Sequence, residues 1–208
     1  MVRLFVGLSL PEDLRNRLAA LSGGLPGARW TPVENLHLTL RFIGEVDEPR
    51  ADAIDQALST IRAGVLKLTV GGLDTFDQTR GRYGLWVGVH RDERLDHLHD
   101  KIERAVVAAG MPAERRRFHP HITLARLTNP SLPRLQAFIA GHNLFEARVR
   151  ISHFTLFSSH LGHGDPVYRA ECDYPLKRWP GGMMSGRGGG GRRPEGAPPA
   201  EGEKTDLR

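Results

Sequence analysis

The sequence is poor in cysteine and in long apolar runs, and each absence excludes a class of protein. Cys172 is the only cysteine in 208 residues, so an intramolecular disulfide or a zinc site made of several cysteines cannot form. No apolar run approaches the roughly 20 residues that span a bilayer. The opening residues, MVRLFVGLSLPEDLRNRL, predict a strand and a helix rather than a signal peptide. We therefore expect a cytoplasmic protein that does not enter a membrane.

Charge and length leave the function open but limit the size of the fold. The formal net charge of +5 is compatible with a polyanionic partner such as RNA and does not require one. The length suits one medium-sized domain or two small lobes that share a core. We expect the protein to be a monomer.

The last 29 residues differ in composition from the rest of the chain. Residues 180–208 read PGGMMSGRGGGGRRPEGAPPAEGEKTDLR, which is rich in glycine and proline and contains no aromatic residue. A segment of this kind buries too little apolar surface to offset its loss of conformational entropy. The sequence therefore predicts a folded domain over residues 1–179 and a disordered tail over residues 180–208.

Hydrophobic periodicity in the domain predicts alternating strands and helices. Turn and capping residues mark the ends of these segments, and several strands are separated by turns too short for parallel crossovers. The expected strands cover residues 2–8, 36–42, 66–70, 72–76, 83–89, 121–127, 145–151, 154–157 and 167–172, and the expected helices cover residues 12–21, 48–61, 92–109 and 132–140. This order predicts an α+β fold with a largely antiparallel sheet and two related halves.

Two of the expected strands carry the same short motif. The chain reads HLTL from His37 and HITL from His121. Residues at positions i and i+2 of a strand share one face and lie roughly 7 Å apart at about 3.3 Å per residue. In the first copy strict alternation places His37, Thr39 and Arg41 on one face and the apolar residues, Phe42 included, on the core face. Each strand is thus expected to present an imidazole and a hydroxyl to the same space.

The two motifs together suit chemistry on a phosphodiester. Two imidazoles with an unperturbed pKa near 6.5 can act as general base and general acid. Two hydroxyls, from Thr39 and Thr123, can donate hydrogen bonds to phosphate oxygens as charge develops on them. Arg41 and Arg126 lie near the motifs and could add cationic stabilisation. The spacing suggests no metal site and no Ser–His–carboxylate arrangement.

These residues also carry a family resemblance. The segments HLTLRFIGEV and FHPHITLAR closely resemble the two signature motifs of the 2H phosphoesterase superfamily. The nearest branch is the 2′-5′ RNA ligase-like one, the LigT-like RNA 2′,3′-cyclic phosphodiesterases. The opening RLFVGLSLPEDL is similar to the family's first strand and helix, and FTLFSSHLGHGDPVYRAECDYPL to its closing hairpin.

The resemblance implies a fold of two similar lobes, each an antiparallel sheet backed by helices, with a central groove. It implies hydrolysis of RNA 2′,3′-cyclic phosphate ends to 2′-phosphates without a metal or cofactor. His37 and His121 match the catalytic histidines, Thr39 and Thr123 the residues that hold the phosphate, and Arg41 and Arg126 stand where the family often has basic residues. In the family's usual assignment His37 would protonate the leaving 3′-oxygen and His121 would activate water, although the reverse is chemically possible.

Two other functions remain open at this point. The first is the joining of RNA ends through a 2′-5′ linkage. Because water is present at very high concentration, hydrolysis is favoured unless the groove binds a second RNA end that competes with water. The second is a non-catalytic basic RNA-binding module whose strands only contact phosphate. Turnover by the protein would separate an enzyme from such a module.

Overall fold

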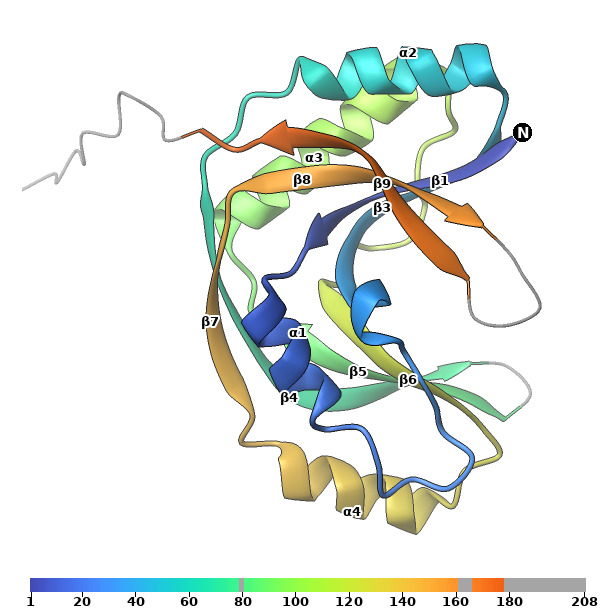
Figure 1. Cartoon of the computed structure of the whole chain (residues 1–208), viewed down its shortest axis with the longest axis vertical. Helices are drawn as coiled ribbons and strands as arrows, with labels where there is room; N and C mark the ends of the chain where they lie inside the picture. The colour runs from blue at the N-terminus through green and yellow to red at the C-terminus, as the bar shows by residue number, and fades with distance from the viewer. Residues whose placement is uncertain (79–80, 161–165, 178–208) are drawn as a thin grey trace, which may run out of the picture.

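Nine strands of the described chain form one antiparallel sheet that curls into two lobes (Figure 1). This computed structural model describes residues 1–78, 81–160 and 166–177. The strands are β1 Val2–Ser9, β2 Arg29–Trp30, β3 His37–Val46, β4 Leu66–Gln78, β5 Arg82–Val89, β6 His121–Thr128, β7 Glu146–Ile151, β8 His153–His160 and β9 Val167–Pro175. The helices are α1 Glu12–Ala19, α2 Glu48–Ser59, α3 Glu93–Ala108 and α4 Leu132–His142, with a short 3-10 helix at Val33–Asn35.

The order of the strands divides the sheet into two sets of four. One set is β9-β8-β1-β3, the other is β6-β5-β4-β7, and the small strand β2 pairs with β6. The two motif strands β3 and β6 are neighbours at the centre, where they pair antiparallel only at Leu38 and Ile122. Both of these residues are fully buried. The sheet therefore brings the two copies of the motif side by side, from distant parts of the chain.

The two halves of the sequence exchange a helix: α3, from the second half, packs on the first lobe, and α1, from the first half, contacts the second lobe. The order β1-α1-β3-α2 is repeated as β5-α3-β6-α4. Helices α2 and α3 pack on each other and on strands of the first lobe, β1, β3 and β9, while α4 packs on β4 of the second lobe. Helix α1 also reaches the second lobe, where the Arg17 side chain donates a hydrogen bond to the Glu146 carbonyl at 2.8 Å. Each lobe is therefore in contact with a helix from the other half of the sequence (Figure 1).

Capping residues in the sequence mark the beginning of α2 and α3. Asp47 caps α2 by accepting a hydrogen bond from the Arg50 amide, and Asp92 caps α3 by accepting from the amides of Arg94 and Leu95. Gly110, with φ of +89°, follows α3 in a backbone conformation that glycine adopts without strain. The buried residues of α3 are spaced at three and four positions, as expected for one apolar face: Leu95, Leu98, Ile102 and Val106.

The predicted fold class is confirmed: the protein is α+β, with two similar lobes of antiparallel sheet backed by helices. The segments expected as separate strands at 66–70 and 72–76 are one strand, β4, which is irregular between Val70 and Leu73. Strands β8 and β9 are longer than predicted, and β2 was not predicted. The predicted tail, residues 180–208, lies outside the described residues. No helix of the described chain is long and apolar enough to cross a membrane.

Candidate active site

A pocket of about 100 Å³ lies where the two motif strands meet. Both imidazoles and both hydroxyls of the predicted site line it, from β3 and β6. Its other walls come from the segment between α1 and β3 and from the beginning of β9. The lining residues are Arg29, Trp30, Thr31, Pro32, Asn35, His37, Thr39, Phe42, His121, Thr123, Arg126, Pro166 and Tyr168.

Backbone carbonyls fix the tautomer of both histidines. The Nδ1 atom of His37 lies 2.6 Å from the Asn35 carbonyl oxygen, and Nδ1 of His121 lies 2.7 Å from the His119 carbonyl oxygen. A carbonyl oxygen can only accept, so both Nδ1 atoms carry the proton that is donated. This leaves each Nε2 available for chemistry. The Nε2 atom of His37 is 3.0 Å from the Thr39 hydroxyl, which can donate to it when the imidazole is neutral.

Aromatic side chains surround each histidine in a similar way in the two lobes. The ring centroids of Phe5, Phe157 and Tyr168 lie 4.9, 5.9 and 5.2 Å from that of His37. The rings of Phe76, Trp86 and His119 lie 4.9, 5.9 and 6.1 Å from that of His121. These rings cover part of each imidazole and hold its orientation. The packing therefore preorganises two imidazoles beside one pocket.

Burial lowers the pKa of both imidazoles, and more strongly at His37. Desolvation, together with the charge of a protonated His121, lowers the pKa of His37 to about 4, and the hydrogen bond to the Asn35 carbonyl opposes this shift. Desolvation also lowers the pKa of His121, again opposed by a backbone carbonyl, that of His119. In the free protein at neutral pH, both groups are thus neutral. A bound phosphate anion would raise both pKa values.

Both motif strands contain a β-bulge at the leucine of His-x-Thr-Leu. In the pairing of β1 with β3, Val6 is opposite Arg41 and Gly7 is opposite Thr39, so Leu40 is the extra residue. In the pairing of β5 with β6 the extra residue is Leu124, by the same count. After each bulge the two faces exchange. The residue that follows the bulge points toward the core, and the next one points toward the pocket.

Because of the bulge in β3, two residues lie on the opposite side of the strand from the one that the sequence predicted. Phe42, expected in the core, is 63% exposed and lines the pocket, whereas Arg41 is only 6% exposed and does not. The structure thus places Arg41 outside the pocket, away from where its predicted substrate-binding role would put it. Arg126 occupies in β6 the position that Phe42 occupies in β3, and it lines the pocket as predicted. Strict alternation fails here because the extra residue shifts the side-chain period by one.

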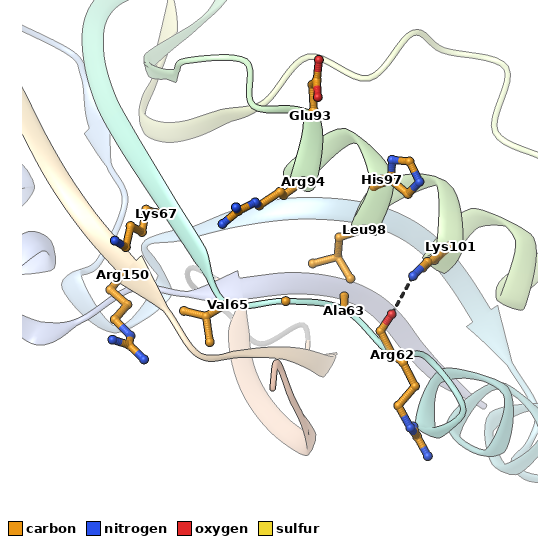
Figure 2. Close-up of a pocket in the computed structure, with 11 residues that line it drawn as sticks. Arg62, Ala63, Val65, Lys67, Glu93, Arg94, His97, Leu98, Lys101 and Arg150 are labelled. Carbon is orange, nitrogen blue, oxygen red and sulfur yellow. Dashed lines mark hydrogen bonds between the residues drawn. The ribbon is translucent and has the colours of Figure 1, made fainter. Parts of the chain in front are cut away.

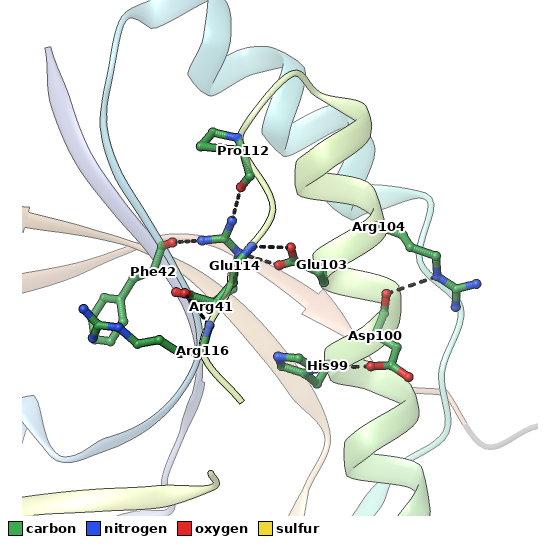
Figure 3. Close-up of polar contacts among 9 residues, drawn as sticks. All are labelled: Arg41, Phe42, His99, Asp100, Glu103, Arg104, Pro112, Glu114 and Arg116. Atoms are coloured by element: carbon green, nitrogen blue, oxygen red, sulfur yellow. Dashed lines mark hydrogen bonds and ion pairs between the residues drawn. The ribbon is translucent and has the colours of Figure 1, made fainter. Parts of the chain in front are cut away.

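Arg41 instead contacts helix α3 and nearby backbone carbonyls in the first lobe (Figure 3). Its guanidinium donates to the Glu103 carboxylate on α3 and to the backbone carbonyls of Phe42 and Pro112. The second oxygen of Glu103 accepts from the Glu114 amide at 2.8 Å. The ion pair thus connects β3 to α3 and to the segment that leads into β6. Its role is structural.

Sequence reasoning missed several residues that shape the pocket. Asn35 is buried, and its side-chain amide donates to the Pro166 carbonyl at 2.7 Å while its own carbonyl orients His37. Arg29 and Trp30 line the pocket from a segment without a recognised motif, and Tyr168 lines it from the closing hairpin, in which the sequence singled out no residue. The aromatic residue Phe42 could have been found from the internal repeat, because it is offset from His37 by the same five positions that separate Arg126 from His121.

The low pKa of His37 predicts a pH-dependent stability. Because the unfolded imidazole binds a proton near pH 6.5 and the folded one near pH 4, stability falls as pH decreases from about 7 to about 4. The expected contribution is about 2–3 kcal/mol at pH 4.5. Urea unfolding of wild type and His37→Gln at pH 7.5 and 4.5 isolates this contribution, because other groups titrate in both proteins. An unchanged difference between the two proteins would show that His37 titrates normally.

The fold and the pocket define a class: a two-lobed α+β protein whose duplicated strands present paired histidines and threonines to one site. Comparisons with known proteins agree. The chain matches the family model of the 2′-5′ RNA ligase superfamily over residues 10–163. The chain therefore belongs to the 2′-5′ RNA ligase superfamily.

Individual relatives share both sequence and fold with this chain. A protein from Aeropyrum pernix named RNA 2′,3′-cyclic phosphodiesterase is 36% identical over 139 residues, which cover 65% of this chain and 79% of the relative. A protein of the same name from Escherichia coli is 30% identical over 181 residues, 85% of this chain and 95% of the relative. The crystal structure of E. coli LigT complexed with 3′-AMP superposes with a TM-score of 0.69 at 26% identity and covers 85% of this chain and 99% of that one.

Proposed function

We propose that this protein is an RNA 2′,3′-cyclic phosphodiesterase that hydrolyses cyclic phosphate ends to 2′-phosphomonoesters with His37 and His121 as acid and base. The observation that carries the proposal is the pairing of two imidazoles, each with a carbonyl-fixed Nδ1 and an available Nε2, in one pocket. The names of the relatives supply the substrate class. The substrate would be an RNA or nucleotide that ends in a 2′,3′-cyclic phosphate.

The two Nε2 atoms suit the two proton transfers of this hydrolysis. His121 takes a proton from water as the water oxygen attacks phosphorus. The bond from phosphorus to the ribose 3′-oxygen breaks, and protonated His37 gives its proton to that oxygen. The products are a 2′-phosphomonoester and a 3′-hydroxyl, with His121 protonated and His37 neutral. The family resemblance supports this assignment of acid and base.

Phosphate binding itself prepares the acid. His37 is neutral in the free protein because burial lowers its pKa, and a general acid must be protonated. The negative charge of the bound cyclic phosphate opposes that shift. Thr39, Thr123 and the Arg126 guanidinium line the same pocket, where they can bind the non-bridging oxygens as charge develops. Arg126 takes the cationic role that the sequence assigned to both arginines.

Turnover of an oligonucleotide that ends in a 2′,3′-cyclic phosphate tests this function. We expect conversion of the cyclic end to a monoester, with no joined product when a second oligonucleotide with a free 5′-hydroxyl is present. Hydrolysis is expected to dominate because water is present at very high concentration and competes with the second oligonucleotide. Binding without turnover would indicate an RNA-binding module, and a joined product would indicate a ligase.

Activity is expected to withstand exhaustive chelation. Among the described residues that line the pocket, none is a carboxylate or a thiol, and a catalytic zinc site usually needs three protein ligands. The two histidines also have proton-transfer roles that a bound metal would block. The measurement is the rate of cyclic nucleotide hydrolysis before and after dialysis against EDTA. Loss of the rate, restored by one divalent metal, would contradict the proposed mechanism.

A further inference from the structure

A second and larger cleft, of about 680 Å³, lies between helix α3 and strands β4 and β7 (Figure 2). One wall is α3, and the other is formed by β4, β7 and the segment that joins α2 to β4. It shares no lining residue with the candidate active site. The lining residues are Arg62, Ala63, Gly64, Val65, Lys67, Glu93, Arg94, His97, Leu98, Lys101 and Arg150.

The charge of this cleft is almost entirely positive. Five of the lining residues are lysine or arginine, and one, Glu93, has a carboxylate. Within residues 1–78, 81–160 and 166–177, none of the five cations forms an ion pair. The Lys101 ammonium donates to the Arg62 carbonyl oxygen at 2.6 Å, a contact that leaves its charge uncompensated.

The cations are arranged on both walls of the cleft. Lys67 on β4 is directly opposite Arg150 on β7, and like charges in such a position destabilise a sheet. Arg94 extends from α3 toward the strand that carries Lys67 (Figure 2). An anion between the walls would remove this repulsion. Clefts lined by one sign of charge also concentrate counter-ions of the opposite sign.

We propose that this cleft binds the phosphate backbone of single-stranded RNA, as a site separate from the one that acts on the RNA end. Lys67, Arg94 and Arg150 are exposed on facing walls, which suits a row of phosphates rather than one enclosed anion. Ala63 and Val65, which line the cleft and are half-buried, offer an apolar surface for ribose or base faces. The proposal rests on the proposed function for its choice of RNA.

Two double variants with the same loss of charge test the proposal. Lys67→Gln/Arg94→Gln removes one cation from each wall, and Arg104→Gln/Arg134→Gln removes two exposed cations outside both pockets. The probe is a labelled single-stranded RNA of about twenty nucleotides with an unreactive 3′-hydroxyl, followed by fluorescence anisotropy over a range of salt concentrations. Hydrolysis of a cyclic mononucleotide by each intact protein is measured in parallel.

We expect the cleft variant to bind this RNA about tenfold or more weakly at low salt and to lose about 1.4 from the slope of log K against log salt, at about 0.7 per phosphate contact. The control variant should bind like wild type, and all three proteins should hydrolyse the mononucleotide equally. Equal RNA binding by both variants, no RNA binding by wild type, or loss of mononucleotide hydrolysis in the cleft variant would overturn the proposal. If no protein hydrolyses the mononucleotide but the binding difference remains, the proposed function fails and the RNA site stands.

Discussion

Replacement of His37 or His121 by alanine is expected to reduce turnover of a cyclic nucleotide by about 10²–10⁴-fold in each case, the usual contribution of one proton-transfer group. The two imidazoles have their Nδ1 atoms fixed by the carbonyls of Asn35 and His119, so Nε2 is the nitrogen that alanine removes from the proposed proton transfers. The measurement is kcat/KM with a 2′,3′-cyclic mononucleotide, and circular dichroism verifies that each variant is folded.

Variants with smaller expected effects test whether the loss of turnover is specific to the two histidines. Thr39→Ala and Thr123→Ala should lose less, about 10–10³-fold, if each hydroxyl resembles a single donor to a charged oxygen. His90→Ala should behave like wild type, because His90 is exposed and lines neither pocket. Wild-type rates in a folded His37 or His121 variant would rule out the two-histidine mechanism.

Replacement of Arg41 by methionine is expected to lower the free energy of unfolding by about 3–5 kcal/mol, since it leaves a partner of a buried ion pair without its counter-charge. Arg41 is 6% exposed, and it also donates to the carbonyls of Phe42 and Pro112. Urea denaturation measures the loss. The double variant Arg41→Met/Glu103→Leu should recover part of it, because it removes the unpaired carboxylate as well.

Arg126→Met provides the matched comparison. Arg126 is exposed beside the pocket, so this variant should change stability by no more than about 0.5 kcal/mol while weakening turnover. The two arginines thus separate structural from functional loss with the same substitution. A stable Arg41→Met protein with impaired turnover would restore the original prediction that Arg41 binds substrate.

The sequence pattern was sufficient to predict the fold class, and the family resemblance implied that the two motifs meet in one groove. The period of two in HLTL and HITL, together with the apolar faces of the helices, defined most strand and helix positions. It also placed His37 and Thr39 on one face of their strand, and His121 and Thr123 on one face of theirs. These predictions succeed because burial of one face fixes the register of a strand.

The errors arise where one residue breaks that period. Neither Leu40 nor Leu124 differs in type from an ordinary core residue, so the bulges leave no signal in the alternation itself. They decide that Arg41 is buried and Phe42 exposed. Asn35 and the aromatic residues around the histidines were missed for another reason: their positions depend on pairing between segments far apart in the chain, such as Asn35 with Pro166.

The identity of the phosphomonoester product tests the central claim most directly. His37 and His121 lie on separate strands and are held by backbone carbonyls and aromatic rings, so acid and base cannot exchange places around a bound ring. In-line attack then expels one oxygen only. Phosphorus NMR of a hydrolysed 2′,3′-cyclic nucleotide, compared with 2′- and 3′-monophosphate standards, should show the 2′-phosphate alone. A mixture, or mainly the 3′-phosphate, would contradict the proposed roles of His37 and His121.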